Sequence, residues 1–186
     1  MARNRRRSDV LIADSATGGP RVAWRIWSII PDPAQPERPV LAGIAGQVWD
    51  KAHIEARCAE STSSHWYHRW VPDVDCSCGV YGLSEFGQAP DHSPRRPYAV
   101  GFVELSGRIL IEESSLRAER GEMIGPLRLV VPDTWRNGSR RIVTGEGAYR
   151  AVPSWIRVGT PAAEWEADTR RQLRWRYGVD AISLEH

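Results

Sequence analysis

The stretch from Cys58 to Tyr81 constrains the fold more than any other part of the sequence. It holds all three cysteines of the chain and two of its five histidines. Thiolate and imidazole are the groups that most often bind zinc in proteins. Because both are concentrated in one short stretch, the sequence predicts a metal site there.

The spacing of these residues favours a single ion. Cys76 and Cys78 lie at positions i and i+2, so on an extended segment both side chains point to the same side. Cys58 can supply a third ligand across a loop, and His68 or His65 a fourth. We favour His68, because His65 lies in a serine-rich segment. Three thiolates and one imidazole select zinc, and a site with all four positions filled is structural.

The alternative is that the three cysteines are small buried hydrophobic residues. Zinc is favoured over this alternative by the residues that surround the cysteines. Residues 59–97 are rich in serine and proline and show no periodic pattern. An irregular segment of this length inside a compact domain is uncommon without something that holds it.

Length and charge limit the organisation of the chain. A chain of 186 residues with a net charge of +2 suits one globular domain, which we place at residues 20–183. Residues 1–19 are predicted to form a flexible basic arm, and Leu184-Glu185-His186 looks like the remnant of an expression tag. A near-neutral charge implies no bulk attraction to nucleic acid or membranes.

The sequence favours a cytoplasmic protein. No apolar run approaches the roughly 20 residues that a membrane span needs. The basic start, which includes Arg5, Arg6 and Arg7, is not followed by the apolar region of a signal peptide. Three cysteines cannot all pair, and cytosolic thiols stay reduced.

Alternating apolar residues predict a mostly β (α+β) domain, either a small bent barrel or a two-layer antiparallel sheet, with a zinc-stapled loop. Gly107 is predicted to bend one long strand rather than to form a hairpin turn, because the apolar residues keep the same parity on both sides of it. A helix is predicted from Pro161 to Tyr177 and ends at Gly178. Its apolar face is predicted to comprise Ala162, Trp165, Thr169, Leu173 and Tyr177. The segment Glu113–Arg120 is predicted to form a helical turn. The predicted strands are residues 21–29, 39–49 (bent at its glycines), 98–111, 127–131, 142–143, 149–152 and 155–158.

The preferred function is a non-catalytic, zinc-stabilised binding or adaptor module for an unknown protein or small molecule. Nine tryptophans and a predominance of arginine among the cations match the residues that dominate interaction hot spots. The best candidates for contact residues lie in the metal loop: Trp66, Tyr67 and Trp70.

An enzyme is the first rival function. Its pocket would be built around Arg108, Arg117, Glu119 and Tyr81, although Arg117 and Glu119 could equally form a structural ion pair. The zinc deaminase pattern is not met, because it requires two residues between the paired cysteines. Cys76 and Cys78 have only one between them.

A weak nucleic-acid binder is the second rival function. The arginines of the N-terminal arm and those of the C-terminal helix could contact phosphates. The near-neutral net charge argues against this function. The arginines concerned are Arg3, Arg5, Arg6 and Arg7 in the arm, and Arg170, Arg171, Arg174 and Arg176 in the helix.

The chain resembles a group of small, uncharacterised actinobacterial proteins over roughly residues 22–131. The resemblance is carried by a Cys…His…Cys-x-Cys-Gly-(Ile/Val)-Tyr segment, a glycine-containing strand and an Arg-Ala-Glu tripeptide. It supports the motif and implies no activity. This chain departs from the group at Ser106 and in the His65-Trp66-Tyr67 insertion. The matching residues here are Cys58, His68, Cys76–Tyr81, Val100–Arg108 and Leu116–Glu119.

Overall fold

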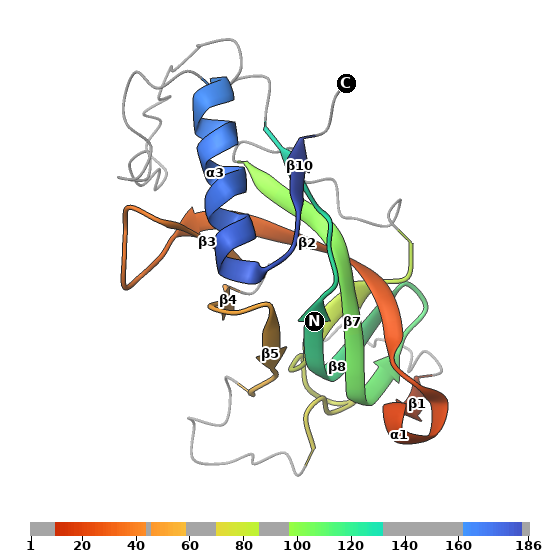
Figure 1. The fold of residues 1–186 in the computed structure, drawn as a ribbon. Coiled ribbons are helices and arrows are strands. Elements are labelled where there is room, and N and C mark those ends of the chain that lie inside the picture. The colour runs from red at the N-terminus through yellow and green to blue at the C-terminus, as the bar shows by residue number, and fades with distance from the viewer. Residues whose placement is uncertain (1–9, 44–45, 59–69, 86–96, 132–161, 184–186) are drawn as a thin grey trace, which may run out of the picture. The chain divides into compact units, whose positions relative to one another are not determined.

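The computed structural model describes residues 10–43, 46–58, 70–85, 97–131 and 162–183 (Figure 1). They fall into two compact units, which are described separately. Unit 1 comprises Met1–Arg25, His53–Pro90 and Phe102–Ile124; unit 2 comprises Ile26–Ala52, Asp91–Gly101 and Gly125–His186. Two long strands, β2 (Arg21–Pro31) and β7 (Tyr98–Ile111), contribute to both units.

The mostly β fold with a C-terminal helix is confirmed. Four strands are joined by successive pairings into a closed ring, which is not a regular barrel. The four strands are β2, β6 (Val80–Leu83), β8 (Ser115–Met123) and β7. No helix in the described ranges is long and apolar enough to cross a membrane.

Unit 1 is an antiparallel sheet in which β8 is the central strand. β7 pairs along one edge of β8. The other edge of β8 pairs with β6 and with β5 (His53–Glu55). Beyond these strands, β6 pairs with β2, and β7 pairs with β1 (Leu11–Asp14).

The predicted bend at Gly107 is confirmed. β7 runs without interruption through this residue, and its register with β8 shifts between Ser106 and Ile109. Gly107 has φ +77°, and an added Cβ would lie 2.8 Å from the Cβ of Glu119. The bulge therefore requires glycine both for its backbone conformation and for the close approach of β8.

The helical turn predicted at Glu113–Arg120 is wrong. This segment begins with a tight turn, in which Glu112 N–H donates to the Ser115 carbonyl at 2.9 Å, and continues as strand β8. The serines that suggested a helix cap instead lie at the turn between β7 and β8. Pairing along both edges of β8 outweighs the local helix propensity.

Part of the segment predicted as a flexible arm, residues 1–19, has regular structure. From Leu11 the chain forms β1, which pairs with the end of β7, followed by helix α1 (Ser15–Gly18). The Asp14 carboxylate accepts from Ala16 N–H at 2.9 Å and so caps α1. Ser15 Oγ accepts from Gly107 N–H at 2.8 Å, which ties this turn to the bulge of β7. Residues 1–9 lie outside the described residues.

Unit 2 contains the remaining strands and the long helix. β3 (Pro39–Ala42) pairs antiparallel with β2 and with β4 (Val48–Trp49). β9 (Leu127–Val130) pairs antiparallel with β7 and parallel with β10 (Ala181–Ser183). The single bent strand predicted at residues 39–49 is therefore wrong: Leu41 faces Trp49 across a hairpin, because the glycine-rich segment between them reverses the chain.

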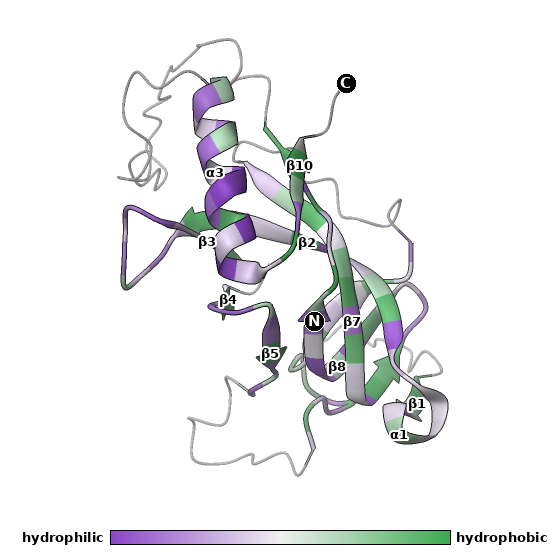
Figure 2. Cartoon of the chain, in the orientation of Figure 1, coloured by the Kyte–Doolittle hydropathy of each residue, from purple (hydrophilic) through white to green (hydrophobic). Residues whose placement is uncertain are grey.

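Helix α3 (Ala162–Tyr177) confirms the predicted helix and its end. The Gly178 N–H donates to the Arg174 carbonyl at 2.9 Å, and Gly178 has φ +68°, as a C-terminal glycine cap requires. Four of the five side chains predicted on its apolar face are buried: Trp165, Thr169, Leu173 and Tyr177. The side chain of Ala162 lies outside those that the structure describes. Figure 2 shows α3 coloured mostly as hydrophilic, as expected for a helix with a narrow apolar face. The predicted helix start and the strands predicted at 142–158 lie outside the described residues.

Candidate metal centre

The sheet of unit 1 brings the three cysteines together. β5 and β6 pair one after the other along the same edge of β8, with Glu55 opposite Arg120 and Val80 opposite Ala118. The end of β5 and the start of β6 therefore meet near the middle of β8. Cys58 follows β5 by three residues and Cys78 precedes β6 by two, so both lie at this junction.

The three thiols form one buried cluster. Their Sγ atoms all lie within 4.8 Å of one another, and those of Cys58 and Cys76 are 3.6 Å apart. Two ligands of a tetrahedral zinc ion, each about 2.3 Å from the metal, lie roughly 3.8 Å apart. The cluster is close enough to bind a metal ion. Val71 is the partly buried hydrophobic residue that packs against it.

The loop that carries Cys76 and Cys78 is held in a tight conformation. Cys76 N–H donates to the Asp73 carbonyl at 3.3 Å, and Asp75 N–H donates to the Asp73 carboxylate at 2.9 Å. Gly79 has φ +127°, and an added Cβ would lie 3.0 Å from Pro72 Cβ. Glycine is therefore required where the loop leaves Cys78 and enters β6.

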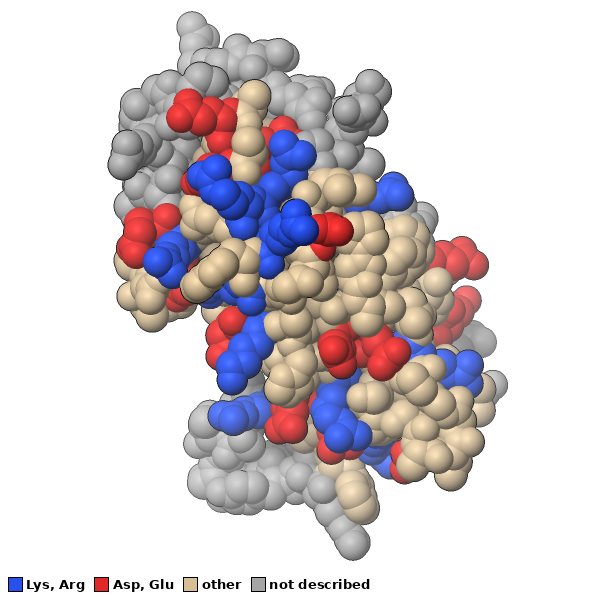
Figure 3. All heavy atoms as spheres, in the orientation of Figure 1, with Lys and Arg blue, Asp and Glu red and all other residues tan. Residues whose placement is uncertain are grey.

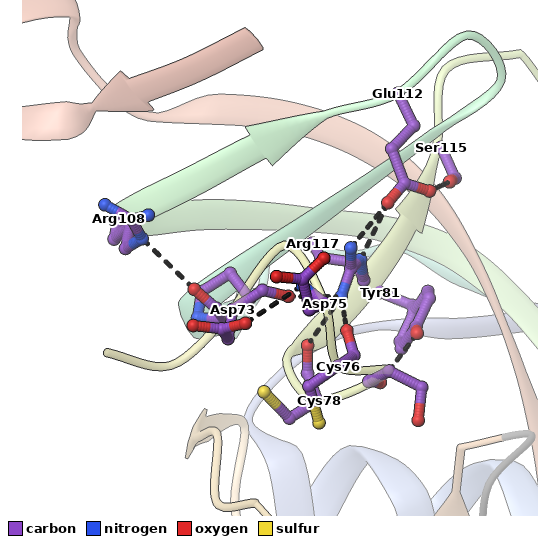
Figure 4. A network of polar contacts seen from close by, with 11 residues as sticks. Asp73, Asp75, Cys76, Cys78, Tyr81, Arg108, Glu112, Ser115 and Arg117 are labelled. Carbon is purple, nitrogen blue, oxygen red and sulfur yellow. Dashed lines mark hydrogen bonds and ion pairs between the residues drawn. The ribbon is translucent and has the colours of Figure 1, made fainter. Parts of the chain in front are cut away.

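Arg117 on β8 anchors this loop from inside the protein (Figure 4). Its buried guanidinium donates to the carbonyl oxygens of Asp73 at 3.1 Å and Cys78 at 3.3 Å, and also to that of Cys76. The other side of the guanidinium donates to Glu112 at 3.0 Å and 2.6 Å. One side chain thus holds the backbone before the two close cysteines and at both of them.

Tyr81 and Arg108 support the same loop. Tyr81 O–H donates to the Ser77 carbonyl at 2.6 Å, and Arg108 Nε donates to the Pro72 carbonyl at 3.1 Å. The Arg117 guanidinium lies 5.9 Å from the centre of the Tyr81 ring, within cation–π range. Tyr81 and Arg108, which were predicted as candidate binding residues, therefore both contact the main chain of the cysteine loop.

Glu119 does not pair with Arg117. Its carboxylate accepts from Arg108 N–H at 3.3 Å beside the bulge of β7, and the side chain is exposed. The partner of Arg117 is Glu112, which was not among the predicted site residues. A hairpin at Glu113-Ser114 would have revealed it, since that turn places Glu112 close to the strand of Arg117.

Burial alters the pKa of two groups at the site, one in the loop and one in β6. It raises the pKa of the Cys76 thiol to about 12, with the neighbouring thiols adding to the effect. Burial also raises the pKa of Tyr81, against the opposing field of Arg117. Without a cation, the Cys76 thiol is therefore neutral at neutral pH, and a bound metal ion would have to displace its proton.

The remaining predicted residues divide into two groups. Trp70, at the edge of the loop, is 54% exposed. Four predicted residues lie outside the described residues: His65, Trp66, Tyr67 and His68. The structure thus brings together three of the four predicted metal ligands and leaves the fourth as a prediction.

A comparison with protein-family models, curated proteins and solved structures finds no match for this chain. The resemblance to actinobacterial proteins accordingly stays a prediction. The case for function rests on the geometry of the site.

Proposed function

We propose that the chain is a non-catalytic binding module whose cysteine loop is held by one structural zinc ion. The single observation that carries the proposal is the buried cluster of Cys58, Cys76 and Cys78, with Sγ atoms within 4.8 Å of one another. Three soft thiolates at this spacing favour zinc over hard cations. The contacts of Arg117 support the proposal, because they hold the loop through its backbone carbonyl groups and leave the sulfur atoms available to bind a metal ion.

His68 is the proposed fourth ligand. An imidazole nitrogen would complete a tetrahedral Cys3His site and leave no position for a reactive water. His65, three residues earlier, is the alternative. Either residue would close the segment between Cys58 and Trp70 onto the ion.

The zinc ion would stabilise a loop that has little apolar surface to bury. In the described part of the loop, Val71 is the partly buried hydrophobic residue beside the cysteines, and Val74 is exposed. Metal binding would then supply folding energy, on the order of 10 kcal/mol in small zinc peptides.

The binding part of the proposal rests on Trp70. An exposed tryptophan beside a rigid loop is a typical anchor for a partner, since its large surface loses little conformational entropy on binding. Trp66 and Tyr67 are proposed to extend the same contact surface. An enzymatic pocket at Arg108, Arg117 and Glu119 is not favoured, because the two arginines donate to the protein's own carbonyl and carboxylate groups.

Substitution of cobalt for zinc tests the ligand set. Cobalt(II) bound by thiolates has sulfur-to-metal charge-transfer bands, and tetrahedral cobalt has strong visible bands. The wild-type protein should show both. His68→Ala should weaken the tetrahedral bands, whereas the matched variant His65→Ala should leave them unchanged. A spectrum without charge-transfer bands at stoichiometric cobalt would overturn the metal proposal, and the reverse result for the two histidines would reassign the fourth ligand.

A further inference from the structure

Unit 2 has a surface hollow beside the C-terminal half of α3. It encloses about 450 Å³ between the helix and the segment that leads into β3. Figure 3 shows basic side chains gathered over this part of the molecule. Besides Glu37, the hollow is lined by Arg38, Pro39, Arg171, Gln172, Trp175 and Arg176.

Trp175 is the most unusual residue of this hollow. Its side chain is 74% exposed, although the other aromatic residues of α3, Trp165 and Tyr177, are buried. The guanidinium of Arg38 lies 5.3 Å from the centre of the Trp175 ring. An exposed indole next to a cation offers a stacking surface and a positive charge side by side.

Charge is segregated along α3. The acidic residues Glu164, Glu166 and Asp168 lie in its first half, and the second half, residues 170–177, carries four arginines and no acidic residue. Cations also suit a helix C-terminus for electrostatic reasons. That preference does not account for an exposed tryptophan among them, nor for Arg38, which comes from a different segment.

The arginines differ in how freely they can bind a ligand. Arg176 is held by a largely buried ion pair with Asp32, so its position is fixed. Arg171 pairs with Asp168, but that pair is exposed and contributes little to stability. Arg171, together with Arg38, whose side chain is exposed, can therefore turn toward an anionic ligand at low energetic cost.

We propose that this hollow binds single-stranded nucleic acid, with a base stacked on Trp175 and phosphate groups next to Arg38 and Arg171. Aromatic stacking combined with arginine contacts is how proteins bind single strands without sequence preference. An acidic peptide would use the arginines, but it would not account for the exposed indole. The proposal goes beyond the proposed function, because it assigns a second binding surface in unit 2, and it does not depend on zinc because the cysteines lie in unit 1.

Binding to a fluorescently labelled oligothymidylate of about ten nucleotides tests the proposal, since single-strand sites span roughly this length. The full-length, metal-loaded protein should bind it with a dissociation constant of about 10⁻⁴ M or tighter at low salt. Trp175→Ala should weaken binding roughly tenfold or more, as the loss of one base-stacking contact does. Arg171→Gln should reduce the slope of log K against log salt by about 0.7, the value for one phosphate contact on a single strand.

Two matched controls locate the site. Arg128→Gln removes an exposed arginine of β9 in the same unit but outside the hollow, and it should leave affinity and salt slope nearly unchanged. Replacement of Arg3, Arg5, Arg6 and Arg7 together by glutamine tests the N-terminal arm. Binding that is lost in this variant and kept in Trp175→Ala would overturn the proposed site.

Three further results would overturn the proposal. One is the absence of measurable binding to the oligothymidylate at low salt. Another is equal affinity of the wild-type and Trp175→Ala proteins. The third is a polyglutamate peptide that binds more tightly than the oligothymidylate and competes with it, which would assign the hollow to an acidic protein partner.

Metal content serves as the independent readout. It should be the same in Trp175→Ala and in the wild type, so failure of this proposal is distinguishable from failure of the zinc proposal.

Discussion

Arg117 and Glu112 form an ion pair at 2.6 Å, and the guanidinium of this pair is buried while the carboxylate remains about one-third exposed. The same guanidinium donates to three carbonyl oxygens of the cysteine loop. Glu112 therefore orients Arg117, and Arg117 in turn fixes the backbone that presents Cys76 and Cys78. The position of the thiols thus depends on a residue of the turn between β7 and β8.

Glu112→Gln tests this dependence. The substitution removes the negative partner of a buried cation, so we expect a loss of about 1–3 kcal/mol in the free energy of unfolding. Glu113→Gln is the matched control, because it changes the adjacent exposed carboxylate. Urea denaturation of the two variants measures the difference. Equal stability of both variants would show that Glu112 does not orient Arg117.

Gly107→Ala tests the bulge in β7. Alanine must adopt φ +77° and bring its Cβ against Glu119, so we expect destabilisation by more than about 1 kcal/mol. In the control, Gly18→Ala, no atom lies within 4 Å of the added Cβ and the backbone is not in the left-handed region. A thermal denaturation midpoint for Gly107→Ala as high as that of Gly18→Ala would argue against a strained bulge.

The two tryptophans of α3 should behave in opposite ways. Trp165 is 5% exposed, and Trp165→Ala should cost about 3–5 kcal/mol of stability, as expected for loss of a buried aromatic side chain. Trp175→Ala should change stability by no more than about 0.5 kcal/mol, since its side chain is exposed. Denaturant titration followed by circular dichroism measures both. An unchanged midpoint for Trp165→Ala would contradict docking of the helix through this residue.

Tyr177 predicts a specific alkaline effect. Its buried O–H donates to the Trp49 carbonyl at 2.7 Å and accepts from Leu41 N–H at 2.9 Å. Burial raises its pKa to about 12 from an ordinary value of 10, so the folded state keeps a proton that the unfolded state loses in this interval. The stabilisation is therefore present below pH 10 and lost as the pH rises toward 12.

Tyr177→Phe isolates this contribution. At neutral pH the variant should lose about 1–3 kcal/mol, because it leaves a buried N–H and a buried carbonyl without the hydroxyl. The difference in stability between wild type and variant should then shrink as the pH rises from 10 to 12. A difference that stays constant over this interval would show that Tyr177 does not titrate in the folded protein.

The sequence predicted those features that depend on local chemistry. Gly178 ends α3, apolar spacing identifies the buried face with Trp165 and Leu173, and apolar parity continues across Gly107. Each of these signals lies within a few residues of the feature it predicts. The three cysteines were grouped correctly because Cys76 and Cys78 are two residues apart and Cys58 is the only other thiol.

Features that depend on the pairing of strands far apart in the sequence could not be predicted from local patterns. The serines before Leu116 resemble a helix cap, and only the ladders on both edges of β8 make the segment a strand. The proximity of Cys58 and Cys78 depends on where β5 ends and where β6 begins along β8, which no local sequence pattern indicates. The role of Arg117 was missed for the same reason, since its carbonyl partners lie about 40 residues earlier in the chain.

The most direct test of the account is the metal content of purified protein that has never been exposed to a chelator. We expect about one equivalent of zinc in the wild-type protein and in Ser77→Ala, which alters the exposed residue between the two close cysteines. Cys76→Ser should lose most of the zinc, and its melting temperature should fall by roughly 10 °C or more, because metal binding is part of the folding energy. Less than about a tenth of an equivalent of any transition metal in the wild type would contradict the account and leave the three cysteines as a buried hydrophobic cluster.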